Sequence, residues 1–225
     1  MSHPIADSTA GGATSSSCGV KLYLVRHGET DWNRQGRWQG QADVPLNRRG
    51  WRQARLAAQR LKDVPLAAII SSDLQRAICT AELIARSCRR SRQRGGRGGA
   101  GVQLPVILDP RLREIHQGAW QGLQVSEIQQ RYARLFQKRM QNPLAVAPPG
   151  GETALQVRQR VVAAVDDIRH RFLGGAVAIV SHGFALAMIL VHYQQQPLER
   201  IWELVPENGA VIELRLDGLP CLASG

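Results

Sequence analysis

Two histidine–glycine steps, far apart in the chain, each follow a short run of apolar residues. His27 comes after the run 22–25 and Arg26, and His182 closely follows the run 176–180. Apolar runs of this length are typical of buried parallel strands. Ligands of open α/β sheets bind beyond the carboxyl ends of the strands. We therefore expect both histidines to face one site.

A further cationic side chain belongs to the same edge of the expected sheet. The apolar run 67–70 is followed by Ser72 and Asp73, either of which could cap the N-terminus of a helix. That cap places Arg76 in the first helical turn, where its guanidinium can approach Arg26 and the histidines. Cationic groups arriving from three strand ends indicate a site for an anion.

Phosphate is the anion that suits these residue types. Arg26 and Arg76 offer guanidinium forks, and a helix that opens at Gly183 would add free N–H donors. Neighbouring positive charge disfavours the protonated form of a histidine, and a neutral imidazole is a nucleophile. We therefore expect His27 to attack phosphorus and to carry the phosphoryl group covalently.

The leaving alcohol would need a proton, and a carboxylic acid is the natural donor. Glu114 is the leading candidate because it lies just past the expected strand 106–108. Glu29 is its competitor, since it lies in the loop that carries His27. Asn33 could add a neutral hydrogen-bond donor to the same pocket.

Five blocks of this sequence resemble the signature of the histidine phosphatase (phosphoglycerate mutase-like) superfamily. Together they span roughly residues 20–216 in the order of the family. The blocks are LVRHGETDWN at 24–33, RWQGQADVPL at 37–46, SDLQRA at 72–77, LREIHQGAWQG at 112–122 and VSHG at 180–183.

The resemblance implies a role for each matching residue, without a metal or another cofactor. His27 becomes the phosphohistidine, while Arg26, Arg76 and His182 hold the phosphoryl oxygens. Glu114 protonates the leaving group and then activates water. The full substrate-binding set comprises Arg26, His27, Gly28, Glu29, Thr30, Asn33, Gln39, Gly40, Arg76, His182 and Gly183.

The segment after Glu114 bears on the choice between hydrolysis and transfer. Residues 115–122 resemble the phosphatase members, whereas the mutases carry Arg-His-Tyr-Gly there. Mutases also carry a longer insertion with paired arginines and a lysine for a second anion, and we find none before 148–153. The resemblance favours hydrolysis of a small phosphorylated metabolite, with phosphoglycerate mutase as the alternative. Sugar phosphates, phosphoserine, phosphoglycerate derivatives and a nucleotide-loop phosphate all stay open.

The elements that must position these residues alternate between strand and helix. This alternation predicts an α/β fold in three layers, with a mostly parallel central sheet, helices on both faces and one antiparallel edge strand. The expected strands are 21–25, 67–70, 106–108, 176–180 and the edge strand 211–216, and the expected helices are 51–62, 73–88, 124–140, 152–173 and a short buried one after His182.

Length and composition predict one globular domain. The chain has 225 residues, of which 44% are hydrophobic. We expect a disordered tail at 1–18, a catalytic domain at 19–218 and a short tail at 219–225. Neither a secretory signal nor an apolar run long enough for a membrane is evident. Cysteine spacing indicates no disulfide framework, so we expect a cytoplasmic protein. We also expect a monomer or homodimer with no membrane partner.

The net charge of +11 invites a different interpretation, because much of it is local. Residues 89–101 are rich in arginine and glycine and predict a disordered insertion. Its two Arg-Gly-Gly triplets could hold RNA, which is the rival function from another class. We expect no nucleic-acid partner for the main function, because the rest of the chain is only mildly basic. Six arginines cluster in the short stretch 86–97, namely Arg86, Arg89, Arg90, Arg92, Arg94 and Arg97.

Overall fold

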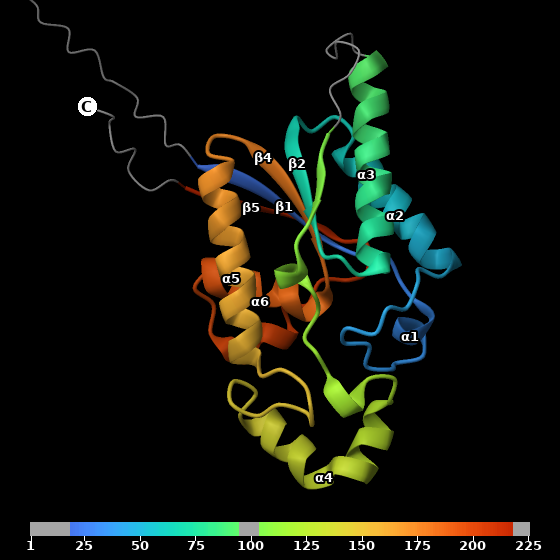
Figure 1. Cartoon of the computed structure of the whole chain (residues 1–225), viewed down its shortest axis with the longest axis vertical. Helices are drawn as coiled ribbons and strands as arrows, with labels where there is room; N and C mark the ends of the chain where they lie inside the picture. Colours follow the sequence, from blue (N-terminus) through green and yellow to red (C-terminus); the bar gives the residue numbers. More distant parts are fainter. Residues whose placement is uncertain (1–18, 95–103, 218–225) are drawn as a thin grey trace, which may run out of the picture.

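The central sheet of this protein has the topology expected from the strand–helix alternation (Figure 1). The computed structural model describes residues 19–94 and 104–217, and in this part the strand order is β3-β2-β4-β1-β5. The first four strands in that order are parallel, and β5 pairs antiparallel with β1 at one edge. The strands are β1 Val20–Arg26, β2 Leu66–Ser71, β3 Val106–Leu108, β4 Ala176–Ser181 and β5 Val211–Leu216.

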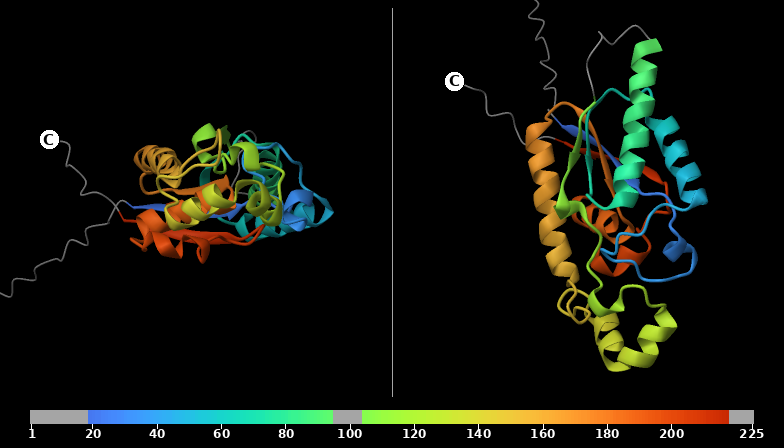
Figure 2. Two further views of the ribbon diagram at one scale, coloured as in Figure 1. Left: turned by 90° about the horizontal axis from the view of Figure 1, so that it is seen from below. Right: turned by 45° about the vertical axis from the view of Figure 1, so that its right-hand side comes forward.

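Helices cover both faces of the sheet, which confirms the three-layer prediction. Helices α2 (Arg48–Leu61) and α3 (Gln75–Arg94) lie on one side, and α5 (Ala154–Arg171) lies on the other (Figure 2, right). Helix α6 (Gly183–Tyr193) packs with α5 in the same apolar cluster. Helices α1 (Asp31–Arg34) and α4 (Val125–Gln141) lie beyond the carboxyl ends of the strands.

Strand β4 shows why both faces need cover. All six of its residues are buried. Because successive side chains point to opposite faces of a sheet, Val177 and Ile179 contact the α5 and α6 layer. Ala178 and Val180 contact the α2 and α3 layer. Full burial of one such valine or isoleucine contributes about 1.5–3 kcal/mol to folding.

Several element boundaries differ from the sequence-based expectations. Helix α2 begins at Arg48, since Asn47 accepts a hydrogen bond from the Gly50 N–H at 2.8 Å and caps it. Helix α3 begins only at Gln75, because Asp73 is engaged by the side chain of Arg113.

The prediction of a disordered insertion at 89–101 is wrong for the first six of these residues, because α3 continues to Arg94. Two contacts hold this last part of the helix against the neighbouring α2 end. Cys88 is buried and its Sγ donates to the carbonyl of Leu61 at 3.2 Å. Ser91 hydrogen-bonds to Asp63. The remainder of the insertion and the two expected tails lie outside the described residues.

Across the described ranges, no helix is long and apolar enough to cross a membrane.

Candidate active site

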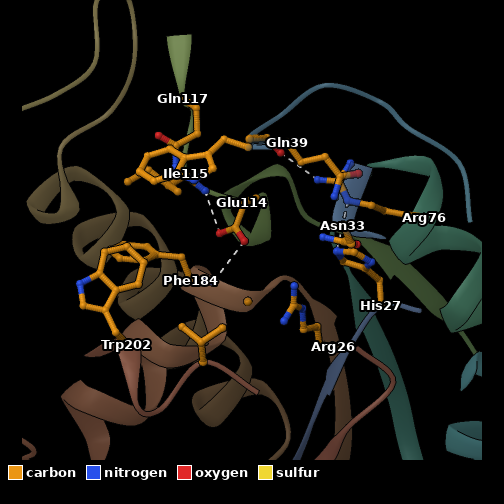
Figure 3. A pocket seen from close by; sticks show the side chains of 14 residues that line it. Arg26, His27, Asn33, Gln39, Arg76, Glu114, Ile115, Gln117, Phe184 and Trp202 are labelled. Atoms are coloured by element: carbon orange, nitrogen blue, oxygen red, sulfur yellow. Dashed lines mark hydrogen bonds between the residues drawn. The ribbon is translucent and has the colours of Figure 1, made fainter. Parts of the chain in front are cut away.

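A cavity of about 350 Å³ opens beyond the carboxyl ends of β1 and β4 (Figure 3). The segments that follow these strands carry His27 and Gly183, and the start of α3 brings Arg76 to the same place. The side chains and glycines that line the cavity are Arg26, His27, Asn33, Trp38, Gln39, Gly40, Arg76, Glu114, Ile115, Gln117, Gly183, Phe184, Trp202 and Val205.

Two hydrogen bonds fix the tautomer of His27, whose ring is almost fully buried. Its Nε2 lies 3.3 Å from Nε of Arg76. A guanidinium can only donate, so Nε2 must be the unprotonated nitrogen. Its Nδ1 lies 2.6 Å from the carbonyl oxygen of Gly28 and carries the proton that this oxygen accepts. The ring lone pair therefore resides on the Nε2 atom, where it accepts from Arg76.

The surroundings of His27 also keep the ring neutral. Burial lowers the pKa of His27 well below 6.5, and the positive charges of Arg76 and Arg26 lower it further. The pKa of His182 is lowered in the same direction, again chiefly by burial. The two rings lie 5.0 Å apart. Both histidine rings are therefore neutral at neutral pH.

Arg76 is completely buried and rigidly held. Its Nη1 donates to the carbonyl of Ala42 at 2.7 Å, and its Nη2 donates to that of Gly40 at 2.8 Å. Burial lowers the pKa of Arg76 to about 10, and the negative charge of Glu114 acts in the opposite direction. Arg76 is therefore still a cation at neutral pH, and it ties the 40–42 segment to the cavity wall.

Arg26 and His182 each keep a buried nitrogen without a hydrogen-bond partner. Arg26 donates from Nη1 to the carbonyl of Pro206 at 2.6 Å, while its Nε has no partner. Nε2 of His182 lies 2.8 Å from Oγ of Ser72, while its Nδ1 has none. Buried polar atoms are normally paired. These two atoms are consistent with a site that takes an anion close by.

Glu114 lines the cavity at the N-terminus of α6. Its Oε1 accepts from the N–H groups of Ile115 at 3.0 Å and Ala185 at 3.1 Å. Its Oε2 accepts from the N–H of Phe184 at 3.1 Å. Free N–H groups and the helix dipole favour a negative charge at this position. Two of the N–H groups that were expected to be free for phosphate are thus engaged by the Glu114 carboxylate.

The competitor, Glu29, does not line the cavity. Its carboxylate accepts from Nδ2 of Asn47 at 2.9 Å and pairs with Arg49 at 3.5 Å. Gly28 is required for packing, since a Cβ there would lie 2.2 Å from the carbonyl oxygen of Gly50. Thr30 is buried and caps α1 by accepting from the N–H of Asn33.

The structure therefore divides the expected site residues into two groups. Eight of them line the cavity, whereas Gly28, Glu29, Thr30 and His182 lie outside its lining. His182 is still adjacent through its ring contact with His27. The eight are Arg26, His27, Asn33, Gln39, Gly40, Arg76, Glu114 and Gly183.

Sequence reasoning missed part of the cavity wall. Ile115 and Gln117 lie in the block that resembles the family, but nothing marked their side chains. Phe184, Trp202 and Val205 also line the cavity, and their apolar character resembles that of core residues. Asn208 supports the nucleophile loop, since its Nδ2 donates to the carbonyl of His27 at 3.1 Å.

No group of three or more histidine, cysteine or carboxylate side chains that could hold a metal ion occurs in residues 19–94 or 104–217. The cavity charge described above comes instead from Arg26 and Arg76, each of which lines it.

The fold and the cavity together define an enzyme of the phosphatase or phosphotransferase type. Comparison with known proteins assigns the family. The sequence model of the histidine phosphatase superfamily (branch 1) matches residues 22–219. The chain belongs to this superfamily.

Two curated relatives and one solved structure illustrate the range of similar proteins. A probable phosphoglycerate mutase GpmB of Photorhabdus laumondii is 34% identical, over 92% of this chain and 89% of its own. Phosphoserine phosphatase 1 of Hydrogenobacter thermophilus is 32% identical, over 88% of this chain and 87% of its own. The solved structure of Bacillus stearothermophilus YhfR is 38% identical with a TM-score of 0.74, over 88% and 92% of the two chains.

Proposed function

We propose that this protein hydrolyses small phosphomonoesters through a phosphohistidine on His27. The observation that carries the proposal is the contact of Nε2 with Arg76 at 3.3 Å, which makes Nε2 the unprotonated nitrogen of a histidine that lines the cavity. The lowered pKa of His27 supports it, because the ring is then neutral and nucleophilic without a general base.

In the first step, Nε2 of His27 forms a bond to phosphorus as the bond from phosphorus to the ester oxygen breaks. Arg26 and Arg76 offset the negative charge on the phosphoryl oxygens. His182 lies next to the His27 ring. Protonated Glu114 donates its proton to the departing oxygen, so that a neutral alcohol leaves.

In the second step, water takes the place of the alcohol. Glu114, now a carboxylate, accepts a proton from water as the water oxygen attacks phosphorus. The bond from phosphorus to Nε2 breaks, and inorganic phosphate leaves with His27 neutral again. The N–H groups of Phe184 and Ala185 stabilise the carboxylate form of Glu114, which is the form that accepts the proton from water.

The experiment compares His27→Ala with His170→Ala, a control on the exposed side of α5. We expect His27→Ala to abolish release of phosphate and His170→Ala to retain it. The rapidly quenched wild-type enzyme should carry a phosphoryl group that is labile in acid and stable in base. Turnover by His27→Ala, or a trapped group with the opposite lability, would overturn the mechanism.

Phosphoglycerate mutase is the second candidate, because a relative at 34% identity is named as a probable mutase. Incubation with a phosphoglycerate separates the two functions. Hydrolysis releases inorganic phosphate, whereas a mutase interconverts the two isomers and conserves the ester. Interconversion faster than phosphate release would replace our proposal with the second candidate.

A further inference from the structure

The cavity has two chemically different ends, with Glu114 between them (Figure 3). His27, Arg26 and Arg76 lie on one side of Glu114. Ile115, Gln117, Phe184 and Trp202 lie on the other side. The cavity wall is thus cationic where a phosphoryl group would bind and largely apolar elsewhere.

The geometry of in-line displacement indicates which part of the substrate occupies the end of the cavity beyond Glu114. The attacking and leaving atoms lie roughly opposite each other across phosphorus in such a reaction. With His27 as the nucleophile, the leaving group extends past Glu114 toward Phe184 and Trp202. The side chains at that end therefore contact the alcohol portion of the ester. This step rests on the proposed function.

Two aromatic rings form the wall at this end. The centroids of Phe184 and Trp202 lie 5.4 Å apart with an interplanar angle of 52°. Phe184 is buried at the start of α6 and belongs to the apolar core. Trp202 ends the short 3₁₀ helix η3 (Leu198–Trp202) and is 48% exposed, so an open ring face is available to a ligand. Such a pair favours an apolar or aromatic body.

The charges at this end disfavour an anionic leaving group. Among the described residues that line the cavity, only Arg26 and Arg76 are lysine or arginine. Both lie on the His27 side of Glu114 (Figure 3). A second anion beyond Glu114 would meet aromatic rings and a carboxylate, with no cation of the lining to pair it.

We propose that the substrates are phosphomonoesters of uncharged alcohols that carry an apolar or aromatic face. The phosphoryl group lies against His27, Arg26 and Arg76. The apolar face of the alcohol packs on Trp202 and Phe184. Esters whose alcohol bears a carboxylate or a second phosphate are poor substrates.

The first test compares esters whose alcohols differ in one property at a time. Benzyl and methyl phosphate differ in apolar surface, whereas glycerol 3-phosphate and 3-phosphoglycerate differ chiefly in a carboxylate. We expect kcat/KM to favour benzyl over methyl phosphate, and glycerol 3-phosphate over 3-phosphoglycerate, by about ten-fold or more each. Equal values, or a preference for 3-phosphoglycerate, would overturn the inference.

The second test changes the wall itself. Trp202→Ala should reduce the benzyl-to-methyl ratio of kcat/KM about ten-fold, whereas Trp51→Ala on α2 should leave the ratio unchanged. Trp51 is a suitable control because it is 37% exposed and lies outside the cavity lining. Val205→Lys should raise the relative kcat/KM for 3-phosphoglycerate, because it supplies the missing cation. An unchanged ratio in Trp202→Ala would overturn the assignment of the aromatic wall.

Absence of turnover for every ester would refute the proposed function, whereas turnover with the wrong preferences refutes only the substrate class.

Discussion

Arg160 donates from Nη2 to the backbone carbonyl of Glu114 at 3.0 Å, although it approaches the cavity from helix α5. The same Nη2 lies 2.8 Å from a carboxylate oxygen of Glu152. Its Nη1 donates to the carbonyls of Arg111 at 2.7 Å and Arg113 at 2.6 Å. One guanidinium thus holds the backbone that carries the proposed proton donor.

Arg160→Met should therefore impair proton donation without touching the substrate. We expect kcat for esters with poor leaving groups to fall about ten-fold, since small displacements of a catalytic group are costly. Activated aryl esters, which leave without a proton, should lose less. Arg158→Met is the matched control, because Arg158 is exposed on the same helix and contacts His192. If Arg160 had a purely structural role, Arg160→Met would slow both ester types equally. Arg160→Lys would then not restore the rate for poor leaving groups more than the rate for activated aryl esters.

Glu114→Gln should reveal the acid directly. The amide cannot donate a proton to an alkoxide, so we expect poor leaving groups to slow about 100-fold or more. Activated aryl esters should suffer much less. Glu29→Gln serves as the control, because its carboxylate is engaged by Asn47 and Arg49 outside the cavity lining. A larger loss in Glu29→Gln than in Glu114→Gln would reverse the assignment.

The buried histidines should make the stability depend on pH. Their pKa values are lowered in the folded protein, so between the folded value and 6.5 the unfolded chain binds more protons. This contribution to stability is present above pH 6.5 and is lost as the pH falls below it. We expect the urea midpoint to decrease from pH 7.5 to pH 5, and to decrease less in His27→Asn. The same decrease in wild type and His27→Asn would contradict the role of His27.

Activity should survive removal of divalent cations. Arg26 and Arg76 line the cavity and supply the positive charge that phosphoryl transfer requires. We expect turnover in excess chelator to stay within about two-fold of the untreated rate, because no step relies on a metal-bound water. Phosphate release with and without chelator measures this. Loss of activity that magnesium restores would contradict the prediction.

Deletion of residues 95–101 tests the alternative of RNA binding. The deletion starts after Arg94 because α3 continues to that residue, and the end of α3 lies at the end of the sheet away from α1 and α4 (Figure 1). We expect turnover to stay within about two-fold and stability to change little, since loop length enters only logarithmically. The deletion removes Arg97 and the glycines of both Arg-Gly-Gly triplets, so any retention on nucleic acid that depends on these triplets should fall. A collapse of catalysis would show that the segment serves the active site.

Sequence alone was sufficient for the architecture and for the cationic end of the cavity. The apolar runs before His27 and His182 mark two adjacent parallel strands, β1 and β4, as the structure confirms. Topology then requires their carboxyl ends to meet at one edge. Arg76 could be placed there as well, because it follows a third such strand within a few residues. These inferences rest on local patterns and on a general rule of sheet geometry.

The choice between Glu114 and Glu29 needed the tertiary structure. Both lie in loops next to expected site residues, and only their packing separates them. Glu29 turns to the Asn47 side chain, whereas Glu114 meets the N-terminus of α6, about seventy residues later in the chain. Contacts across such distances leave no local signal in the sequence.

The same reason applies to the far end of the cavity and to the end of α3. Phe184 and Trp202 resemble core residues in the sequence, and only the fold places them opposite His27. The composition after Cys88 predicted a loop, yet the buried contact of Cys88 with Leu61 holds that part of the chain in a helix. Composition and periodicity describe each segment by itself, whereas the occupant of a cavity depends on side chains that only long-range packing brings together.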